Sequence, residues 1–341
     1  MTMYYVGLDV HKKTVSYCMK DAGGTVIGEG VLLANRPALG RWAEGLKSAW
    51  TGGMEATLFT GWIYDFLQPY ASVLRVAHPL RLRAITASKK KNDRIDAATL
   101  ADLLRCNLFP DCYMAPARIR ELRRVLRYRN LLVREATRMK NKTSGLLMEV
   151  GASYDKKRLH GAKYFSTLLG NLSDVPGSVI DLLKMTRVNL QVFQAAQKRL
   201  LEALVVHPDL KERVQRLQSI SGVGEVMALT WALEIGEPGR FASIDEAASY
   251  CGLCSALVVS AGKSKRGPLS KQRNAHLQSM LIEAAKLAPR WNAQLAAVHR
   301  RELDRGANPN WATLAVARKL VAYLLAVDKS GRAFQPREVA A

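Results

Sequence analysis

The amino-acid sequence predicts an α/β domain at the N-terminus, then a helical coiled-coil arm and a mainly α-helical C-terminal domain. Short β-prone runs open the chain and then alternate with helical segments, which is typical of a mixed sheet. Two long amphipathic segments follow in the middle of the chain. Later, apolar helices are separated by stretches rich in Gly, Ser and Cys. A chain of 341 residues has room for two or three domains.

The first domain is expected to begin with three strands. Residues 3–10, 14–20 and 25–33 are β-prone, and Gly23 and Gly24 mark a turn, so an antiparallel meander is predicted. The next expected elements are a helix over 41–49, a strand over 53–57, a helix over 61–71, a strand over 73–77 and a helix over 93–106. Between the last two, the basic stretch up to Arg94 lacks periodicity and predicts a loop.

A long basic helix is expected next, from Arg118 to Lys142. It carries ten Lys and Arg residues against two acids, Glu121 and Glu135. A second helix, from about residue 179 to 206, has apolar residues near heptad spacing. Two long helices of this kind predict a helical hairpin or coiled-coil arm.

The last part of the chain predicts a helical domain. Residues 217–235 indicate two helical segments around a Gly-Val-Gly turn at 222–224, and further helices are expected over 274–287 and 310–327. With a boundary near residue 213, the expected domains are 1–112, 113–213 and 214–341.

Charge is the strongest compositional signal. The chain has 51 Lys and Arg against 29 Asp and Glu, a formal net charge of +22. A polyanion is the usual partner of such an excess, and nucleic acid is favoured because no stretch approaches the roughly 20 apolar residues of a membrane span. The N-terminal residues do not have the pattern of a signal peptide, and the five cysteines are too few and too scattered to predict a disulfide framework. We therefore expect a cytoplasmic protein with no membrane partner.

Four acidic residues stand at positions suited to a metal site. Asp9 ends the first expected strand, and Glu55 lies on a later one. Asp93 and Asp96 are three residues apart at the start of a helix, so they share one face. Clustered carboxylates repel one another unless cations lie between them, and two Mg²⁺ ions about 4 Å apart assist phosphodiester transfer. The alternative for each acid is a structural role as an N-cap, a helix-dipole partner or an exposed strand residue.

Three segments resemble the DEDD transposases of bacterial insertion sequences in order and spacing. They are residues 7–13 (Gly-Leu-Asp-Val-His-Lys-Lys), 54–57 (Met-Glu-Ala-Thr) and 91–97 (Lys-Asn-Asp-Arg-Ile-Asp-Ala). The resemblance implies an N-terminal domain of the ribonuclease-H or RuvC-like fold in an RNA-guided recombinase. It also implies the acidic quartet that holds Mg²⁺, two ions per site with Mn²⁺ as an alternative, namely Asp9, Glu55, Asp93 and Asp96.

A second resemblance to the same family lies near the C-terminus. Residues 250–253 and 258–267 resemble the region in which a serine in a turn is the DNA nucleophile, followed by a basic loop. The resemblance implies that Ser260 is this nucleophile, and the competing serines are Ser255, Ser264 and Ser270. The basic residues of the implied phosphate track are Lys263, Lys265, Arg266, Lys271 and Arg273. A serine hydroxyl needs activation, and because no His base is evident nearby, the acid-held metal is expected to provide it. By chemistry alone, Ser260 is a turn hydroxyl.

Further contacts to nucleic acid are expected elsewhere. The turn at residues 220–225 resembles a helix-hairpin-helix, whose amides hold a DNA phosphate; the alternative is a tight helical connection that needs glycine. The long basic helix is expected to follow a phosphate backbone through Arg120, Arg123, Arg124, Arg127, Arg134 and Arg138. Tyr128 and Trp311 are either base-stacking residues or core aromatics. Cys251 and Cys254 have no further ligands at suitable spacing, so no zinc site is expected.

The predicted function is that of a site-specific DNA recombinase, the transposase of an insertion sequence. The resemblance implies that it acts on DNA, both element ends and target, with a structured noncoding guide RNA and a phosphoserine intermediate. Because the acids and Ser260 lie on separate domains, a composite site in a dimer or tetramer is expected, in the bacterial cytoplasm at the nucleoid. Two alternatives stay open: a metal-dependent endonuclease of the Holliday-junction type that uses water, and a non-catalytic RNA- or DNA-binding protein.

Overall fold

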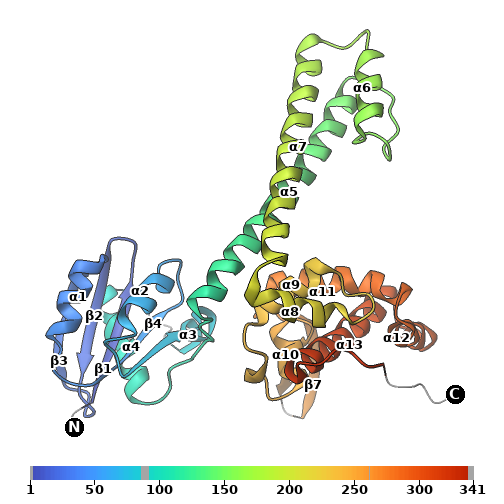
Figure 1. Cartoon of the computed structure of the whole chain (residues 1–341). Helices are drawn as coiled ribbons and strands as arrows, with labels where there is room; N and C mark the ends of the chain where they lie inside the picture. Colours follow the sequence, from blue (N-terminus) through green and yellow to red (C-terminus); the bar gives the residue numbers. More distant parts are fainter. Residues whose placement is uncertain (1–2, 86–91, 261, 337–341) are drawn as a thin grey trace. The chain divides into compact units, whose positions relative to one another are not determined.

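The computed structural model describes residues 3–85, 92–260 and 262–336 of the chain. The chain divides into two compact units, Met1–Ala117 and Arg118–Ala341, which are described one at a time. The first unit is a mixed α/β sheet with helices, and the second is mostly helical (Figure 1). The predicted fold class is confirmed at this level.

The sheet of the first unit consists of β1 (Tyr4–Val10), β2 (Thr14–Lys20), β3 (Val26–Leu33), β4 (Trp50–Glu55) and β5 (Val73–Ala77). Its strand order is β3-β2-β1-β4-β5. β1, β2 and β3 pair antiparallel, which confirms the predicted meander. β4 and β5 extend the sheet as parallel strands beside β1. The carboxyl ends of β1, β4 and β5 therefore meet at one edge.

The helices described in this unit are α1 (Arg36–Gly45), α2 (Thr60–Leu67), α3 (Pro79–Ile85) and α4 (Asp93–Arg105). One sheet face packs against α1 and α2, where Leu8, Leu39 and Ile63 are fully buried. On the other face, Leu100 and Leu104 of α4 form a smaller core with neighbouring apolar residues. The sheet is thus sandwiched between two helical layers.

β4 lies at Trp50–Glu55 instead of the predicted 53–57, and α2 ends at Leu67 instead of residue 71. Two helices also begin where the sequence did not predict a helix start. α1 begins at Arg36 instead of residue 41, because the Asn35 side chain caps it by accepting from the Ala38 backbone N–H at 2.9 Å, and a proline stands in its first turn. The stretch predicted as a loop contains α3, which starts at Pro79. The rest of that predicted loop, residues 86–91, lies outside the described residues.

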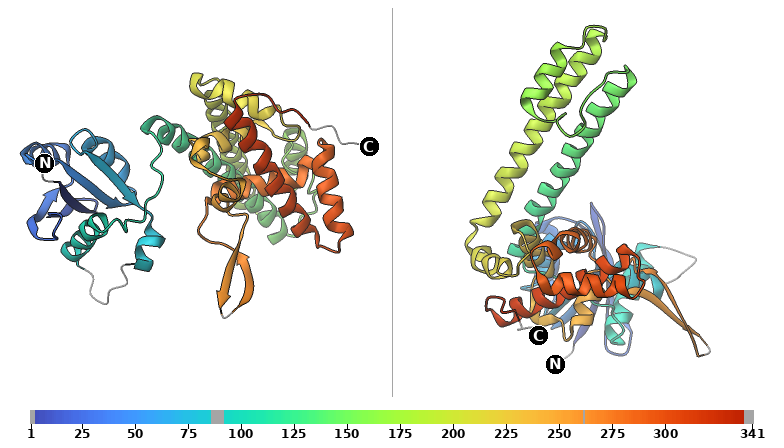
Figure 2. Two further views of the ribbon diagram at one scale, coloured as in Figure 1. Left: turned by 90° about the horizontal axis from the view of Figure 1, so that it is seen from below. Right: turned by 90° about the vertical axis from the view of Figure 1, so that its right-hand side faces the viewer.

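The second unit begins with α5 (Ala117–Glu149), α6 (Ala162–Gly170), α7 (Gly177–Val205), α8 (Pro208–Gln218) and α9 (Glu225–Ile235). The long helices α5 and α7 lie side by side, as Figures 1 and 2 show, and the Thr143 hydroxyl donates to the Thr186 hydroxyl at 3.0 Å. α5 continues past the predicted end at Lys142 because Leu146 and Leu147 are buried against α6 and α7. Tertiary packing therefore lengthens this helix.

The C-terminal part contains α10 (Ile244–Tyr250), β6 (Ser255–Ser260), β7 (Lys263–Leu269), α11 (Ala275–Leu287), α12 (Ala293–Asp304) and α13 (Pro309–Ser330), with short 3₁₀ turns at Pro238–Arg240 and Ala288–Arg290. Its core surrounds α9, whose residues from Met227 onward are buried. The base of α5 joins the same core through Leu122 and Leu126. β6 and β7 form a hairpin, which extends away from the helices in Figure 2, where the sequence predicted only an interrupted stretch.

α13 changes one expectation about apolar segments. Over its 22 residues it is long and apolar enough to cross a membrane by length and composition, whereas no such stretch was predicted from the sequence. Half of its most apolar window is buried inside the protein. Leu320, Val321 and Leu324 belong to the C-terminal core. These contacts are those of the central helix of a folded domain.

Candidate active site

Asp9 and Glu55 meet at the carboxyl edge of the sheet. Asp9 is near the end of β1 and Glu55 is the last residue of β4. These strands are parallel, and Leu8 is the register partner of Met54. Asp9 comes directly after Leu8 and Glu55 directly after Met54, so the two acids occupy neighbouring positions on adjacent strands.

The glycines before these acids show which face the acids occupy. A Cβ on Gly7 would lie 1.9 Å from the Ala97 carbonyl oxygen in α4, and one on Gly53 would lie 3.0 Å from the Leu104 side chain. Both glycines thus face α4 at close range. Strand residues two apart share a face, so Asp9 and Glu55 lie on the α4 side of the sheet.

The N-terminus of α4 brings two further acids to this edge. Asp93 and Asp96 are both in its first turn. Asn92 is the N-cap, and its side chain accepts from the Arg94 backbone N–H at 3.0 Å. The alternative that Asp93 caps the helix is therefore not what the structure shows, and the Asp93 carboxylate is free to face Asp9.

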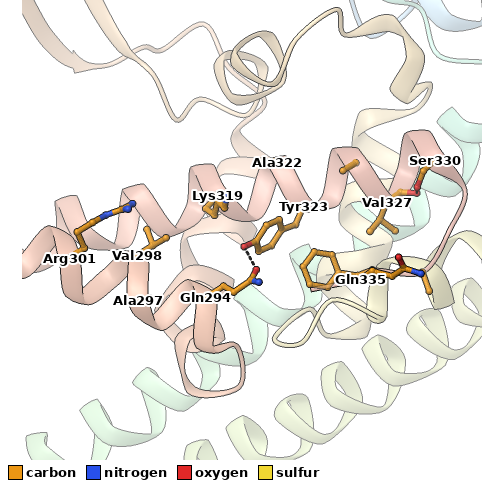
Figure 3. A pocket seen from close by; sticks show the side chains of 13 residues that line it. Gln294, Ala297, Val298, Arg301, Lys319, Ala322, Tyr323, Val327, Ser330 and Gln335 are labelled. Atoms are coloured by element: carbon orange, nitrogen blue, oxygen red, sulfur yellow. Dashed lines mark hydrogen bonds between the residues drawn. The ribbon is translucent and has the colours of Figure 1, made fainter. Parts of the chain in front are cut away.

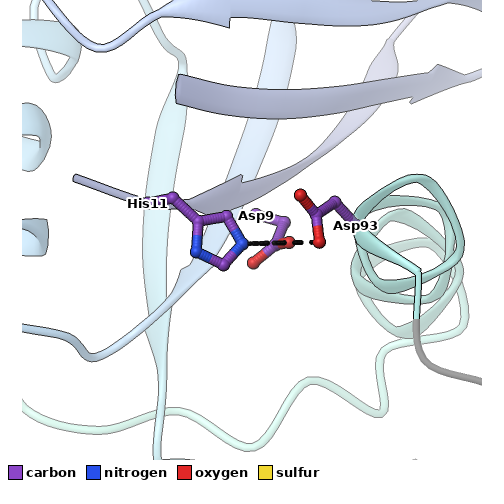
Figure 4. A group of neighbouring side chains, drawn as sticks. All are labelled: Asp9, His11 and Asp93. Carbon is purple, nitrogen blue, oxygen red and sulfur yellow. Dashed lines mark hydrogen bonds and ion pairs between the residues drawn. The ribbon is translucent and has the colours of Figure 1, made fainter. Parts of the chain in front are cut away.

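Three side chains converge at the centre of this edge (Figure 4). His11 Nε2 lies 3.0 Å from Asp9 Oδ2 and 3.6 Å from Asp93 Oδ1. One ligand atom from each of Asp9, His11 and Asp93 lies within 4.8 Å of the others. This spacing is suited to a metal ion. His11 is part of the resembling segment at residues 7–13, but it is not among the site residues predicted from the sequence. The available signal was its position two residues after Asp9.

The carboxylates of this group repel one another, and this repulsion affects the pKa of Asp9. Burial raises the pKa of Asp9, His11 lowers it, and the charges of Asp93 and Asp96 raise it again, with a net upward shift. Asp96 is thus close enough to act on Asp9. A bound cation would remove this repulsion, because it stabilises the ionised carboxylates.

Two ion pairs hold α4 against the antiparallel strands. Lys20 Nζ lies 2.6 Å from Asp102 Oδ2, and the Lys20 side chain is almost fully buried. Arg94 Nε donates to Glu29 Oε2 at 2.8 Å. Arg94 follows Asp93 directly, so this largely exposed pair links the first turn of α4 to β3.

Ser260 lies in the second unit, at the end of the β6–β7 hairpin. It is exposed and is the register partner of Lys263. Gly262, in the connecting turn, has φ +76°, a left-handed conformation that favours glycine. Ala261 lies outside the described residues. The acids and Ser260 belong to different compact units.

The other serines and basic residues of this region are placed as follows. Ser264 is exposed on β7, Ser255 begins β6, and Ser270 Oγ accepts from the Gln272 backbone N–H at 3.2 Å. Lys263, Lys271 and Arg273 are exposed, and Arg273 also donates to the Ser270 carbonyl at 2.9 Å. The side chains of Lys265 and Arg266 are outside what the structure describes.

Two arginines expected to bind phosphate are used inside the protein. Arg127 donates through two nitrogens to the Glu234 carboxylate, each at 2.7 Å, and Arg123 donates to the Leu233 carbonyl at 2.9 and 2.8 Å. Glu234 is fully buried. We therefore reassign Arg123 and Arg127 to anchoring α5 on α9.

The other four arginines of α5 that were expected to bind phosphate are exposed to different degrees. Arg124, Arg134 and Arg138 are exposed, and Arg120 is half-buried. Arg138 donates to Glu135 at 3.0 Å, an exposed pair that contributes little stability. These residues leave a basic strip on α5 that is smaller than the sequence predicted.

The turn between α8 and α9 has a packing role. Gly222 has φ +95°, and a Cβ there would lie 2.7 Å from the Ala288 side chain. The structural alternative, a tight connection that needs glycine, therefore describes this turn. Contact of its amides with DNA stays a prediction.

Cys251 is fully buried, and burial raises the pKa of its thiol to about 12. A thiol held in this protonated form packs as a small apolar side chain.

Family models match both parts of the chain. A model of DEDD transposases of the IS110 type, described as a transposase, matches residues 6–151, which include all four acids. A second model, described as the transposase IS116/IS110/IS902 family, matches residues 214–300, which include Ser260.

Curated relatives are transposases by name. The chain is 24% identical to a putative transposase of Sinorhizobium fredii, with 96% of this chain and 89% of that protein covered. It is 26% identical to a probable family 20 transposase of Pseudomonas aeruginosa, with 63% and 66% covered. It is 24% identical to the transposase for insertion sequence element IS1111A of Coxiella burnetii, with 82% and 76% covered.

The two family matches lie in order along the chain and together span more than half of it. The acidic edge of the sheet lies within the first match and the serine hairpin within the second. The chain therefore belongs to the IS110 family of insertion-sequence transposases, enzymes that act on DNA.

Proposed function

We propose that this transposase cuts and rejoins DNA at a metal site formed by Asp9, Glu55, Asp93 and Asp96, with Ser260 as the nucleophile. The observation that carries the proposal is the convergence of Asp9, His11 and Asp93 within 4.8 Å. Asp9 lies on β1, His11 follows that strand directly, and Asp93 lies on α4, so the fold brings Asp93 to the other two. No structural need of the sheet explains why two carboxylates should face each other there.

The donors fit a hard divalent cation. Carboxylate oxygens are the ligands preferred by Mg²⁺ and Mn²⁺, so we propose two Mg²⁺ ions per site, held by Asp9 and Asp93 with Asp96 and Glu55 beside them. Bound there, the ions would stabilise charge on the scissile phosphate. The imidazole of His11 matches Mg²⁺ less well, so we assign it to orienting the Asp9 carboxylate through their 3.0 Å contact.

The proposed strand step is a transesterification. Ser260 Oγ forms a bond to the DNA phosphorus, the bond from phosphorus to one sugar oxygen breaks, and the serine proton ends on that oxygen. A sugar hydroxyl of another strand reverses the step, which restores Ser260 and closes the backbone. One phosphate ester replaces another at each step, so no external energy source is required.

Nine basic residues are the proposed phosphate contacts. They are Arg120, Arg124, Arg134 and Arg138 on α5, and Lys263, Lys265, Arg266, Lys271 and Arg273 on and after the hairpin. We propose that they bind the DNA of the element ends and target and a noncoding guide RNA. The net charge of +22 supports a polyanion partner of this kind.

A homo-oligomer, either a dimer or a tetramer, is also part of the proposal. α7 carries four exposed apolar residues at a spacing that places them along one side: Leu182, Met185, Val188 and Val192. A stripe of this kind on a long helix favours coiled-coil packing against another helix. We place the assembly in the bacterial cytoplasm at the nucleoid, where its DNA substrate lies.

The covalent intermediate provides the decisive test. Purified protein is incubated with Mg²⁺ and labelled element-end DNA, and protein–DNA adducts are separated on a denaturing gel. D9N and S260A are expected to abolish both the adduct and recombination, because each removes a reacting part. S264A, which changes an exposed serine on the same hairpin, is the matched control and is expected to retain the adduct.

Each other outcome identifies a different function. An adduct in S260A would show that another serine is the nucleophile. Metal-dependent cleavage without any adduct in the wild type would support an endonuclease that uses water. Binding without cleavage would support a non-catalytic nucleic-acid-binding protein.

RNA guidance has a separate test. Sequencing of RNA that copurifies with the protein is expected to return one structured transcript from the flanks of the gene, with segments that pair with element and target DNA. D9N is expected to retain this RNA. A mixture of unrelated cellular transcripts would contradict RNA guidance and leave the metal site unaffected.

A further inference from the structure

Two cavities among the described residues of the C-terminal domain have aromatic residues in their lining, and these aromatic residues differ in their contacts with the rest of the protein. The larger, of about 880 Å³, lies along α12 and α13 with Tyr323 in its wall (Figure 3). The Tyr323 ring packs on Phe334 at 4.7 Å between centroids, and Lys319 Nζ lies 5.2 Å from its centre. Its hydroxyl lies 2.6 Å from Gln294 Oε1. The ring and the hydroxyl of Tyr323 are thus both in contact with other residues of the protein.

The second cavity, of about 450 Å³, lies between the base of the β6–β7 hairpin, α11 and the start of α13. Leu269, Ile282 and Leu314 provide an apolar lining, and Trp311 is exposed by 50% at its side. The polar residues of the lining include Lys286, Asn308 and Asn310. An apolar slot with an aromatic face and a few polar groups is typical of a small-ligand site.

The backbone of Trp311 is held by a hydrogen bond, whereas its ring makes no stacking, cation–π or hydrogen-bond contact within the described residues. The Asn308 side chain accepts from the Trp311 backbone N–H at 3.0 Å, which fixes the first turn of the long, buried helix α13. Within the described residues, no ring or cation packs on Trp311 and no acceptor meets its Nε1. An aromatic face on a rigid element is therefore available for a partner.

We propose that this cavity binds an unpaired nucleobase of the DNA strand, stacked on Trp311, with Lys286 against the adjoining phosphate. Stacking on an aromatic side chain accepts any base, because every base has a π-face. The side-chain amide of Asn310, and the amide nitrogen that Asn308 keeps beside its cap hydrogen bonds, suit the polar edge of a base better than an aliphatic side chain. Among the described residues, the ion pair of Lys286 is with Glu283, at 2.8 Å on the surface. An exposed pair of this kind is weak, so the charge of Lys286 can also act on a phosphate.

The place of the cavity on the hairpin favours DNA as the ligand. Ser255 lines the cavity, and Ser260 ends the same strand about 17 Å further on at the usual rise per residue. A strand whose phosphate is at Ser260 reaches the cavity with a base a few nucleotides away. The choice of DNA rests on the proposed function, whereas the base-binding chemistry of the cavity does not.

The test compares strands with and without bases. Full-length protein is titrated into a labelled oligothymidine and into a strand of equal length in which every nucleotide is abasic, and binding is followed by fluorescence anisotropy. The wild type is expected to bind the strand with bases about tenfold more tightly, a discrimination that W311A loses. W311F is expected to keep most of it.

The matched control is W291A. Trp291 is exposed by 61%, also in the C-terminal domain, but does not line this cavity. W291A is therefore expected to discriminate like the wild type. The salt dependence separates the two proposed contacts: K286Q is expected to lower the slope of log affinity against log salt by about 0.7, while W311A leaves the slope unchanged.

Three results would overturn the inference. They are full discrimination in W311A, an equal loss in W291A, or Trp311-dependent binding seen with an RNA strand of the same length but not with DNA. Circular dichroism and thermal unfolding show whether each variant is folded, and W311F and K286Q carry the test if W311A is not. Normal adduct formation in W311A together with unchanged base discrimination would reject this inference and leave the proposed function intact.

Discussion

Two groups of carboxylates in this protein have opposite surroundings. Glu234 is fully buried, yet Arg127 and Asn274 donate hydrogen bonds to it and Arg123 lies 3.6 Å away. Burial raises the pKa of Glu234, but these hydrogen bonds and charges outweigh burial, so its pKa is lowered. At the acidic edge of the sheet, no Lys or Arg within the described residues forms an ion pair with Asp9 or Asp93.

The difference separates a carboxylate that the protein neutralises from a group that is proposed to bind a metal ion. The fold supplies several donors to Glu234, because a buried charge without partners is costly. Within the described residues, the ion-pair partner of Asp9 and Asp93 is His11, and the charge of Asp93 still raises the pKa of Asp9. The proposed metal ion would relieve this repulsion.

The largest effect on stability is expected from E234Q. The change removes the counter-charge of two arginines at a buried position, and breaking such a pair costs about 3 kcal/mol of the free energy of unfolding, near the low end of the range because Arg127 is partly exposed. Denaturant unfolding of the second unit measures it. E212Q, at an exposed glutamate of α8, is the control with an expected change within about 0.5 kcal/mol. Equal effects would mean that Glu234 is not a structural centre.

Mg²⁺ is expected to stabilise only the first unit. At a concentration one hundred times the dissociation constant, binding to the folded state adds about 2.7 kcal/mol to the free energy of unfolding. D93N is expected to lose this gain because it removes a ligand, whereas E234Q keeps it. Unfolding followed with and without EDTA measures the gain. Stabilisation of D93N equal to that of the wild type would place the ion elsewhere.

The smallest expected effect is a pH dependence in EDTA. Because burial and the charges of Asp93 and Asp96 raise the pKa of Asp9, the folded state holds this proton more tightly than the unfolded state does. Stability of the first unit is therefore expected to fall as pH rises from the ordinary carboxyl pKa through the raised pKa of Asp9. D9N is expected to remove this fall.

Saturating Mg²⁺ is expected to reverse the trend, since metal binding needs ionised carboxylates. NMR titration of the Asp9 carboxyl group in D93N provides an independent check. Its pKa is expected to be lower than in the wild type because one repelling charge is gone. An unchanged pKa would mean that the two groups do not interact in solution.

Much of the first unit was predictable because its signals are local. Alternating apolar residues and a Gly-Gly turn predicted the meander, and the spacing of Asp93 and Asp96 placed both acids on one turn of a helix. The role of the glycines was not predictable. Gly7 is required by the approach of Ala97, a residue 90 positions away in the chain, and nothing near Gly7 in the sequence indicates that contact.

The arginines of α5 show the same limit. Arg123, Arg124 and Arg127 look equivalent in the sequence, but Arg123 and Arg127 are anchored on α9, whereas Arg124 is exposed. The face of a helix that is buried depends on where its partner helix lies. His11 was not predicted as a site residue for a related reason. Its role depends on contacts with two acids from different elements, and these contacts form only in the folded protein.

Charge, helical periodicity and the acidic and serine segments belong to the linear sequence, since each depends on residue type at short spacing. Which charges are neutralised within the protein and which stay available to a partner was decided by tertiary structure alone. The reason is electrostatic: the energy of an ionised side chain depends on its desolvation and on the groups within a few ångströms of it, and for Asp9 and Glu234 those groups come from distant parts of the chain.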